Sequence, residues 1–179
     1  NRGLDLAKGR YLAIMDADDI ALPERLQVQY DFMEQHKEYA WCGCNTRLFD
    51  ENGIWGERKM PELPSDKDYL PFSPFIHPTV MYRRKLFEKN EGYHVSPETL
   101  RCEDYEIFMR LHQLGYQGYN IQEPLLHMRA GSDMYLRRAG WKYAKTQAKL
   151  FKFMKQQGFI GKGQYIKSCV IRSGSALAP

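Results

Sequence analysis

The stretch YLAIMDADDIAL occupies residues 11 to 22 and carries the strongest indication of the fold. Its first five residues are apolar, as in a short buried strand, and Asp16, Asp18 and Asp19 follow within four positions. In open α/β sheets, ligands bind in the crevice at the carboxyl ends of the strands. The stretch therefore puts three carboxylates where such a sheet would hold a ligand.

This acidic cluster has two interpretations. Asp is favoured in turns and at helix N-caps, and Pro23 indicates that a helix begins soon afterwards. Alternatively, carboxylate oxygens two positions apart at a strand end can hold Mg²⁺ or Mn²⁺ bridging the phosphates of a nucleotide. A bound cation would also relieve the repulsion among the three carboxylates. The cluster alone does not separate a capped turn from a metal site.

The composition indicates one folded domain of ordinary size. The chain has 179 residues, of which 43% are hydrophobic, which excludes a disordered segment. No uncharged apolar run is long enough to cross a bilayer. Because the sequence starts at Asn1 without a signal segment, we expect a processed chain or a piece of a longer one.

The cysteines favour a reducing compartment over a disulfide framework, because there are only four and their spacing is irregular. Cys42 and Cys44 alternate along an expected strand, so both should face the same side. A zinc site would need CxxC-type spacing and a second ligand pair. We therefore expect buried, inert thiols.

The hydrophobic pattern predicts an alternation of helices and strands. Helices are expected over residues 1–8, 23–36, 103–114 and 132–157, and strands over 10–15, 40–49, 77–84 and 119–127. The turn residues at 50–53 predict a hairpin, and the proline-rich stretch 56–76 predicts a long loop with one helical turn at 66–70. In the helix over 23–36, we expect Leu26, Tyr30 and Met33 to form the apolar face.

A second acidic pair, Glu103 and Asp104, begins the clearest helix. Acidic side chains there are stabilised by the helix macrodipole, which explains the pair without any function. One of the two could instead act as a general base that takes a proton from an attacking hydroxyl. Neither acidic cluster decides between its two interpretations by itself.

The two clusters and the text between them resemble one family, the bacterial family 2 glycosyltransferases of the GT-A fold. The resemblance covers nearly the whole chain and rests on four motifs in order: NRGLDLAKGRYLAIMDADD at 1–19, HPTVMYRR at 77–84, EDYEIFMRL at 103–111 and RAGSDMYLRR at 129–138. It implies an α/β fold, a GT-A-like (Rossmann-like) mixed sheet flanked by helices. The N-terminal nucleotide-binding βαβ portion of the family has no counterpart here, so the chain looks like the second half of a catalytic domain.

The resemblance also implies roles for individual residues. DADD at 16–19 looks like the DxD motif, in which Asp16, Asp18 and Asp19 bind the donor and Asp18, with Asp16, holds the metal. Asp104, in preference to Glu103, would be the general base of an inverting transfer. Acceptor or diphosphate contacts are expected at His77, His127 and Arg129, although His127 also fits a structural histidine.

The implied activity is transfer of a sugar from a nucleotide-sugar donor to a glycan or lipid-linked acceptor. Mn²⁺ or Mg²⁺ would offset charge on the leaving diphosphate while the base activates the acceptor hydroxyl. Two alternatives stay open at this stage. One is a non-catalytic binding module, and the other is a metal-dependent phosphotransferase or nucleotidyltransferase, which gives no account of Glu103 and Asp104.

The charge is uneven along the chain. Residues 1–130 hold 16 Lys and Arg against 21 Asp and Glu, whereas 131–179 hold 10 against one. We therefore expect two parts, residues 1–130 as the catalytic half-domain and 131–179 as a basic helical segment. Five cations repeat at helical spacing in this segment, beside an apolar stripe: Arg138, Lys142, Lys145, Lys149 and Lys152, and Trp141, Ala144, Ala148 and Phe151.

The basic segment fits either a solvated surface helix or attachment to an anionic membrane through residues 134–172. The tail has no recognised DNA or RNA module, so nucleic acid is not expected as a partner. These observations predict a cytoplasmic protein, peripheral at the inner face of the membrane if the second interpretation holds.

Overall fold

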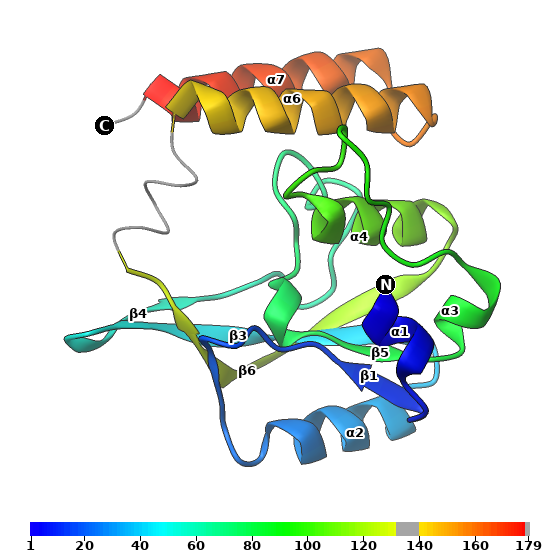
Figure 1. The fold of residues 1–179 in the computed structure, drawn as a ribbon, viewed down its shortest axis with the longest axis vertical. Coiled ribbons are helices and arrows are strands. Elements are labelled where there is room, and N and C mark those ends of the chain that lie inside the picture. The colour runs from blue at the N-terminus through cyan, green and yellow to red at the C-terminus, as the bar shows by residue number, and fades with distance from the viewer. Residues whose placement is uncertain (132–139, 178–179) are drawn as a thin grey trace.

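A mixed sheet of six strands forms the centre of the protein in the computed structural model, which describes residues 1–131 and 140–177 (Figure 1). The strand order is β1-β5-β3-β6-β2, and β4 pairs with β3 outside this path. The strands are β1 (Tyr11–Ala13), β2 (Ile20–Ala21), β3 (Tyr39–Asp50), β4 (Gly53–Arg58), β5 (Met81–Arg83) and β6 (Gln117–Arg129). Among the strands of the described residues, only β3 and β6 pair in parallel. The predicted mixed α/β sheet is confirmed.

The two long strands β3 and β6 form the middle of the sheet. Their pairing shifts register next to Pro124, which has no N–H to donate to the ladder. The hairpin predicted at residues 50–53 is confirmed, since β3 and β4 are antiparallel and Asp50 pairs with Gly53. Gly53 has a φ of +113°, a conformation that suits glycine at a tight turn.

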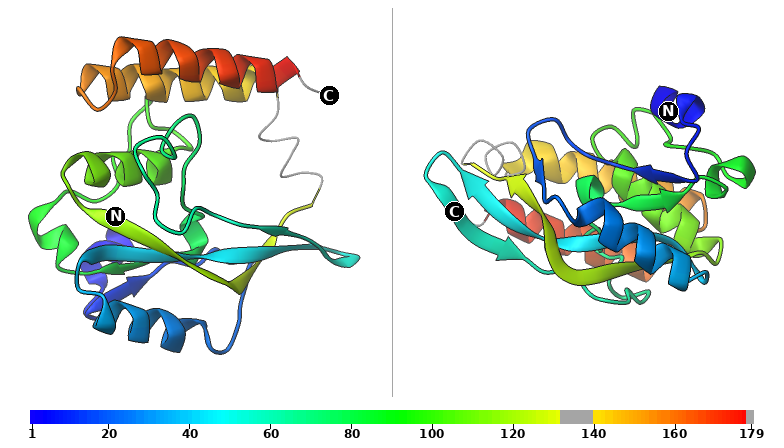
Figure 2. Two further views of the ribbon diagram at one scale, coloured as in Figure 1. Left: turned by 180° about the vertical axis from the view of Figure 1, so that it is seen from behind. Right: turned by 90° about the horizontal axis from the view of Figure 1, so that it is seen from below.

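Helices cover both faces of the sheet in layers. Helix α2 (Arg25–Gln35) lies on one face, as the view from below shows (Figure 2), and α4 (Glu103–Gln113) lies on the other. Beyond α4, α6 (Gly140–Gln156) and α7 (Lys162–Leu177) form an outer layer (Figure 1). The short helices α1 (Arg2–Leu6) and α3 (Leu86–Lys89) lie beside β1 and β5. Among the described helices, none is long and apolar enough to cross a membrane.

The main hydrophobic core lies between the sheet and α4 and continues into the outer layer. The rings of Trp41, Tyr82 and Phe108 pack together at its centre, with ring centroids 5.9 to 6.3 Å apart. Phe151 and Met154 of α6 belong to the same buried cluster. The C-terminal helices therefore share the core of the residues that precede them. A smaller cluster under α2 contains both Cys42 and Cys44, as the strand alternation predicted.

The buried face of α2 differs from the prediction. Arg25, Gln29 and Met33 are buried, whereas Leu26 is 56% exposed and Tyr30 36%. The polar side chains are buried because they hydrogen-bond to backbone carbonyls. Arg25 donates to the carbonyl of Ile14 at 2.8 Å, and Gln29 donates to that of Thr79 at 2.7 Å. Such hydrogen bonds cannot be predicted from the hydrophobic pattern alone.

The single turn predicted at 66–70 is present as a hydrogen-bonded turn over residues 66–69, in which the N–H of Asp68 donates to the carbonyl of Ser65 at 2.8 Å, and it does not continue into a helix. Two further differences concern local structure. The strand predicted at 77–84 begins with a 3₁₀ turn, η1 (His77–Thr79), before β5. Trp141, placed in the apolar stripe, is 52% exposed, and the buried face of α6 consists of Ala144, Gln147, Leu150, Phe151 and Met154. The predicted start of this helix at residue 132, and Arg138, lie outside the described residues.

Candidate active site

Three of the predicted site residues meet in one cavity of about 360 Å³. Asp16 follows β1, His77 begins η1 and Asp104 lies in the first turn of α4, and all three line its wall. A volume of this size is within the range of small-molecule sites. Segments separated by 61 and 27 residues along the chain thus contribute to one concave surface.

Asp16 is positioned by the end of β1. The N–H of Ile14 donates to the carbonyl of Val80 at 2.8 Å, which extends the pairing of β1 beyond its last residue. The chain then turns, and the N–H of Asp19 donates to the carbonyl of Asp16 at 3.3 Å. Asp16 and Asp18 are exposed, but only Asp16 is part of the cavity wall.

Asp19 is buried and holds two segments together. Its Oδ1 accepts the N–H of Arg129 at 2.8 Å, and the Arg129 Nε donates to the carbonyl of Asp18 at 3.2 Å. Burial raises the pKa of Asp19, while the bond from Arg129 acts in the opposite direction. Donor binding by Asp19 stays a prediction, and its contacts favour a structural role in fixing the acidic turn against β6.

Glu103 and Asp104 begin α4 directly after its N-cap residue, Cys102. Both are partly exposed, and Asp104 rather than Glu103 lines the cavity. The position of α4 depends on its buried residues, since Tyr105, Ile107, Phe108 and Leu111 belong to the main core. The helix end is also held by α6, because the Gln147 side-chain amide donates to the Cys102 thiol.

His77 lies between the two acidic segments. Burial lowers the pKa of its imidazole, and the carboxylates of Asp104, Asp16 and Glu103 act in the opposite direction. Its Nε2 forms a 2.8 Å hydrogen bond with the hydroxyl of Tyr93. A lowered pKa means that a neutral imidazole predominates at pH 7.

Tyr93 is held in place by a polar network on α4. The buried Glu106 carboxylate accepts from Arg110 Nε at 2.9 Å and lies 3.1 Å from His94 Nδ1. Arg110 in turn donates to the carbonyl of Gly92 at 2.6 Å. The segment that carries Tyr93 is therefore fixed to the helix that carries Asp104.

The other predicted contacts are not brought to the cavity. Met128 lines the cavity, and His127 points to the opposite face of β6 because side chains alternate along a strand. Arg129 lies over the ring of Phe49, with its Cζ 4.6 Å from the ring centroid. Roles for His127 and Arg129 in substrate binding stay predictions, and the geometry offers no support for them.

The predicted metal site would depend on carboxylate ligands near the end of β1. Within residues 1–131 and 140–177, no three His, Cys, Asp or Glu side chains cluster closely enough to hold a metal ion alone. Mg²⁺, however, is usually bound by one or two carboxylates together with substrate phosphates. Asp16 and Asp18 are exposed hard-oxygen ligands after β1, and Asp16 lines the cavity, so they fit a cation that a diphosphate would help to bind.

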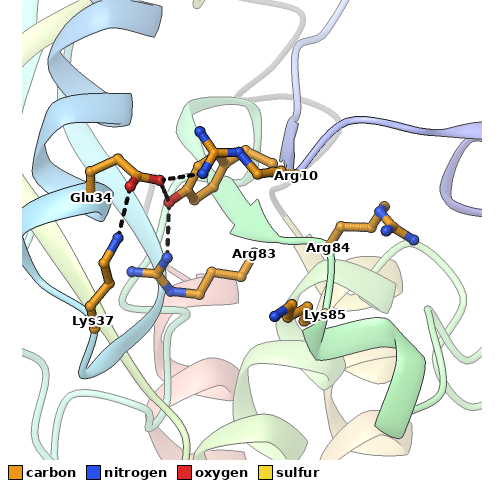
Figure 3. Close-up of a pocket in the computed structure, with 7 residues that line it drawn as sticks. Arg10, Glu34, Lys37, Arg83, Arg84 and Lys85 are labelled. Carbon is orange, nitrogen blue, oxygen red and sulfur yellow. Dashed lines mark hydrogen bonds and ion pairs between the residues drawn. The ribbon is translucent and has the colours of Figure 1, made fainter.

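A second hollow, of about 380 Å³, lies at the opposite end of β1 (Figure 3). Most of its charged groups already have partners within the fold. Glu34 lies 3.3 Å from Arg10 and 2.9 Å from Lys37, and Arg83 donates to the carbonyls of Tyr39 and His36. This hollow has the character of a structural ion-pair network and is not at the carboxyl end of the strand.

Several cavity residues were not found from the sequence. Arg58 of β4, Arg101 before α4, and Tyr143, Gln147 and Arg172 of the C-terminal helices also line the wall. No local pattern marks them, because arginine on a surface helix or strand is ordinary. Only the packing of α6 and α7 over α4 brings the last three to the site.

The sequence matches the family described as Glycosyl transferase family 2 over residues 1–91. It is 37% identical to the putative glycosyltransferase EpsE of Bacillus subtilis over 78% of this chain and 50% of that protein. It is 35% identical to the amylovoran biosynthesis glycosyltransferase AmsE of Erwinia amylovora over the whole chain and 67% of that protein. The chain belongs to glycosyl transferase family 2.

Two further comparisons bear on ligands and fold. A UDP-Gal:alpha-D-GlcNAc-diphosphoundecaprenol beta-1,3-galactosyltransferase of Escherichia coli is 27% identical over the whole chain and 65% of its own length. The crystal structure of S. aureus TarS 1-349 in complex with UDP-GlcNAc superposes with a TM-score of 0.58 at 15% identity, over 83% of this chain and 43% of that one. This likeness confirms the GT-A type of fold. The chain spans half to two thirds of the length of these curated relatives.

Proposed function

We propose that this chain is the part of a glycosyltransferase in polysaccharide biosynthesis that binds the acceptor and the metal ion. The protein would transfer a sugar from a nucleotide-sugar donor to a glycan or lipid-linked acceptor. The observation that carries this proposal is the meeting of Asp16, His77 and Asp104 in one cavity of a family 2 chain. The name of AmsE supports a role in polysaccharide biosynthesis, and the name of the diphosphoundecaprenol galactosyltransferase supports a lipid-linked acceptor.

In the proposed mechanism, Asp104 is the general base of an inverting transfer. Its carboxylate takes the proton of the acceptor hydroxyl as the hydroxyl oxygen attacks the anomeric carbon of the donor. The bond between that carbon and the phosphate oxygen breaks, and the diphosphate leaves with the electron pair. A single displacement inverts the anomeric configuration, and His77, neutral and bound to Tyr93, shapes the wall between base and donor.

Asp16 and Asp18 would hold Mn²⁺ or Mg²⁺. When bound, the cation supplies positive charge, which offsets the negative charge that develops on the leaving diphosphate. The two carboxylates are exposed at the end of β1, where a diphosphate oxygen can share the cation with them. Asp19 would hold this turn in place, because its carboxylate accepts a hydrogen bond from the N–H of Arg129.

Substitution of Asp104 tests the proposal. In the whole protein, Asp104→Asn is expected to lower kcat by about 10²- to 10⁴-fold, because asparagine cannot accept the proton. Glu103→Gln is expected to have a much smaller effect, and Asp31→Asn on α2 is the matched control on the far face of the sheet. Sugar release from the donor and the anomeric configuration of the product, followed by NMR, provide the measurements.

Unchanged turnover in Asp104→Asn would contradict the assignment of the base. Retention of the anomeric configuration would contradict the single displacement. Turnover that survives both Asp16→Asn and Asp18→Asn in the presence of a chelator would remove the metal from the proposal. A protein that binds no nucleotide sugar at all would favour the non-catalytic alternative.

We further propose that α6 and α7 bring the protein to the inner, cytoplasmic face of an anionic membrane. Lys142, Lys145, Lys149 and Lys152 are exposed on α6. Large apolar side chains are also exposed on these two helices: Trp141 at 52%, Ile166 at 51% and Val170 at 65%. Cations combined with exposed apolar side chains are typical of helices that lie on anionic lipid. Vesicle binding tests this proposal.

A further inference from the structure

The C-terminal helices contribute to the cavity wall as well as to the molecular surface. Tyr143 and Gln147 of α6 and Arg172 of α7 line the same cavity as Asp104. The stacking of α6 and α7 above α4 (Figure 1) explains how residues so far along the chain reach it. A segment that the charge pattern assigned to surface attachment is therefore part of the site.

Arg172 is held in a defined place in this wall. Its guanidinium carbon lies 4.4 Å from the ring centroid of Phe72 and 5.5 Å from that of Tyr143. Its Nη2 donates to Oε1 of Gln147 at 2.9 Å. Because Gln147 also donates to the thiol of Cys102, the N-cap of α4, Arg172 is connected to the turn that carries Asp104. A guanidinium stacked on an aromatic ring is oriented without losing its charge.

The electrostatic effect of Arg172 reaches both sides of Asp104. Burial raises the pKa of Cys102 to about 12, and Arg172 acts against this rise. Burial likewise raises the pKa of Tyr105, and Arg172 is the strongest effect in the opposite direction. The positive charge of Arg172 is therefore close to the first turn of α4.

Arg101 reaches the same wall from a conformation that side chains rarely adopt. Its φ is +64°, in the left-handed region, directly before the N-cap of α4. Glycine would occupy this backbone position with less strain, yet the chain has an arginine there and its side chain lines the cavity. Arg58 of β4 supplies a third guanidinium to the same wall.

The positions of Arg101 and Arg172 indicate which substrate they face. A general base acts on the acceptor hydroxyl, so the groups that flank Asp104 lie on the acceptor side of the cavity. The candidate metal ligands Asp16 and Asp18 come from the β1 end, which is the donor side. Guanidinium groups bind phosphate oxygens in a bidentate manner, and a neutral sugar chain would need no such cluster.

We propose that Arg58, Arg101 and Arg172 form a subsite for a phosphate or diphosphate group carried by the acceptor, such as the link between a glycan and a lipid carrier. This inference rests on the proposed glycosyltransferase function and names the chemical class of its acceptor. The donor also carries a diphosphate, so the test must tell the two sources apart.

Binding of farnesyl diphosphate to the whole protein tests the subsite without requiring turnover. Titration calorimetry is expected to show saturable binding of farnesyl diphosphate and none of farnesol at the same concentrations. Arg172→Gln is expected to raise the Kd for farnesyl diphosphate about tenfold, the loss of one charge-assisted bond, while the Kd for UDP stays unchanged. Lys149→Gln, exposed on α6, is the matched control and should leave both constants unchanged.

The variant Arg101→Gly separates loss of binding from loss of folding. Glycine suits the φ of +64°, so this variant should be at least as stable as the parent protein and yet bind farnesyl diphosphate about tenfold more weakly. If both the Arg101→Gly and Arg172→Gln variants bind farnesyl diphosphate with the same Kd as the parent protein, the proposed subsite is overturned. Displacement of farnesyl diphosphate by UDP, with UDP binding weakened by the same factor, would assign the arginines to the donor and overturn the acceptor assignment. Donor hydrolysis retained in either case would leave the proposed function standing.

Discussion

Gly118 shows how one residue can be fixed by the packing around it. It lies in β6 opposite Trp41 of β3, at the start of the parallel pair. A Cβ atom at this position would lie 2.0 Å from Nε1 of Trp41 and 2.7 Å from Cζ of Phe75. Neither ring can move freely, because both are buried in the main core. Glycine is therefore required here by the close approach of an indole ring.

We predict that Gly118→Ala destabilises the protein by about 3 kcal/mol, the upper part of the usual range for overpacking a core. Gly174→Ala is the matched control, since a Cβ at this position in α7 would meet no other described part of the chain within 4 Å. The control is expected to raise the free energy of unfolding by about 0.5 to 1 kcal/mol, because alanine favours a helix interior. Urea unfolding of both variants gives the values, and equal midpoints would refute the packing argument.

At the scale of single elements, α2 is fastened to the sheet by polar contacts as much as by apolar ones. The hydroxyl of Tyr11 in β1 donates to the Glu34 carboxylate at 2.6 Å, and Arg83 of β5 donates to the same hydroxyl at 2.9 Å. Lys37 and Arg10 complete this network around Glu34 (Figure 3). The carboxylate thus links α2 to the edge of the sheet.

The hydrogen bond from Tyr11, followed by that from Lys37, lowers the pKa of Glu34 to about 2 from its ordinary value of 4.5. A depressed carboxyl pKa stabilises the fold above the unfolded-state value, and this contribution is lost as the pH falls toward 2. Glu34→Gln is therefore expected to lower the Tm at pH 7. The difference from the parent protein should shrink between pH 4.5 and pH 2.

Thermal unfolding at a series of pH values measures this effect. Glu51→Gln, in the turn of the β3–β4 hairpin, is the control and should show no comparable pH-dependent difference. A Tm difference for Glu34→Gln that is the same at pH 7 and at pH 2.5 would mean that the ionised carboxylate is not what fastens α2.

On the scale of the whole molecule, α6 and α7 form an outer layer with two faces of different character. The inner face buries Leu150, Phe151 and Met154 in the main core and sends Arg172 toward the cavity. The lysines of α6 remain exposed. This arrangement would allow a membrane-bound acceptor to meet the site next to the surface that we propose binds lipid.

We predict that the chain binds vesicles containing anionic lipid and that added salt weakens the binding. The triple substitution of Lys145, Lys149 and Lys152 by Gln is expected to weaken binding roughly a hundredfold, at about 1 kcal/mol per lysine near the surface. Co-sedimentation measures it, with Lys59→Gln and Lys67→Gln as controls outside α6 and α7. Binding that depends on neither anionic lipid nor salt would contradict the membrane proposal.

The sequence predicted most of the long elements correctly and missed those that depend on packing. Strands 40–49 and 119–127 and the helix from Glu103 were found because their periodicity is local and strong. The two-residue strand β2 was not found, since it exists only through its pairing with His127 and Leu126 of β6. On the buried face of α2, Met33 was predicted correctly, whereas Leu26 and Tyr30 were assigned wrongly. Arg25 and Gln29 are buried in their place because they bind backbone carbonyls that come from other segments.

The candidate site divides in the same way. Its acidic residues could be selected from the sequence, because carboxylates after a strand and at a helix start form recognisable local patterns. His127 was selected from the family resemblance alone, and the alternation of β6 turns it away from the cavity. Arg58, Arg101 and Arg172 carry no such pattern, and their shared position depends on β4, α4 and α7 packing together.

The sequence by itself determined the family, the order of the principal strands and helices, and the carboxylates that any catalytic proposal must use. These properties depend on short stretches of chain, in which side-chain periodicity, turn chemistry and motif spacing act locally. Only the tertiary structure decided that Asp16, His77 and Asp104 share one cavity and that Arg172 lines it. Residues so distant along the chain meet only when the core under α4 and α6 is buried, and burial of apolar surface is a property of the whole fold.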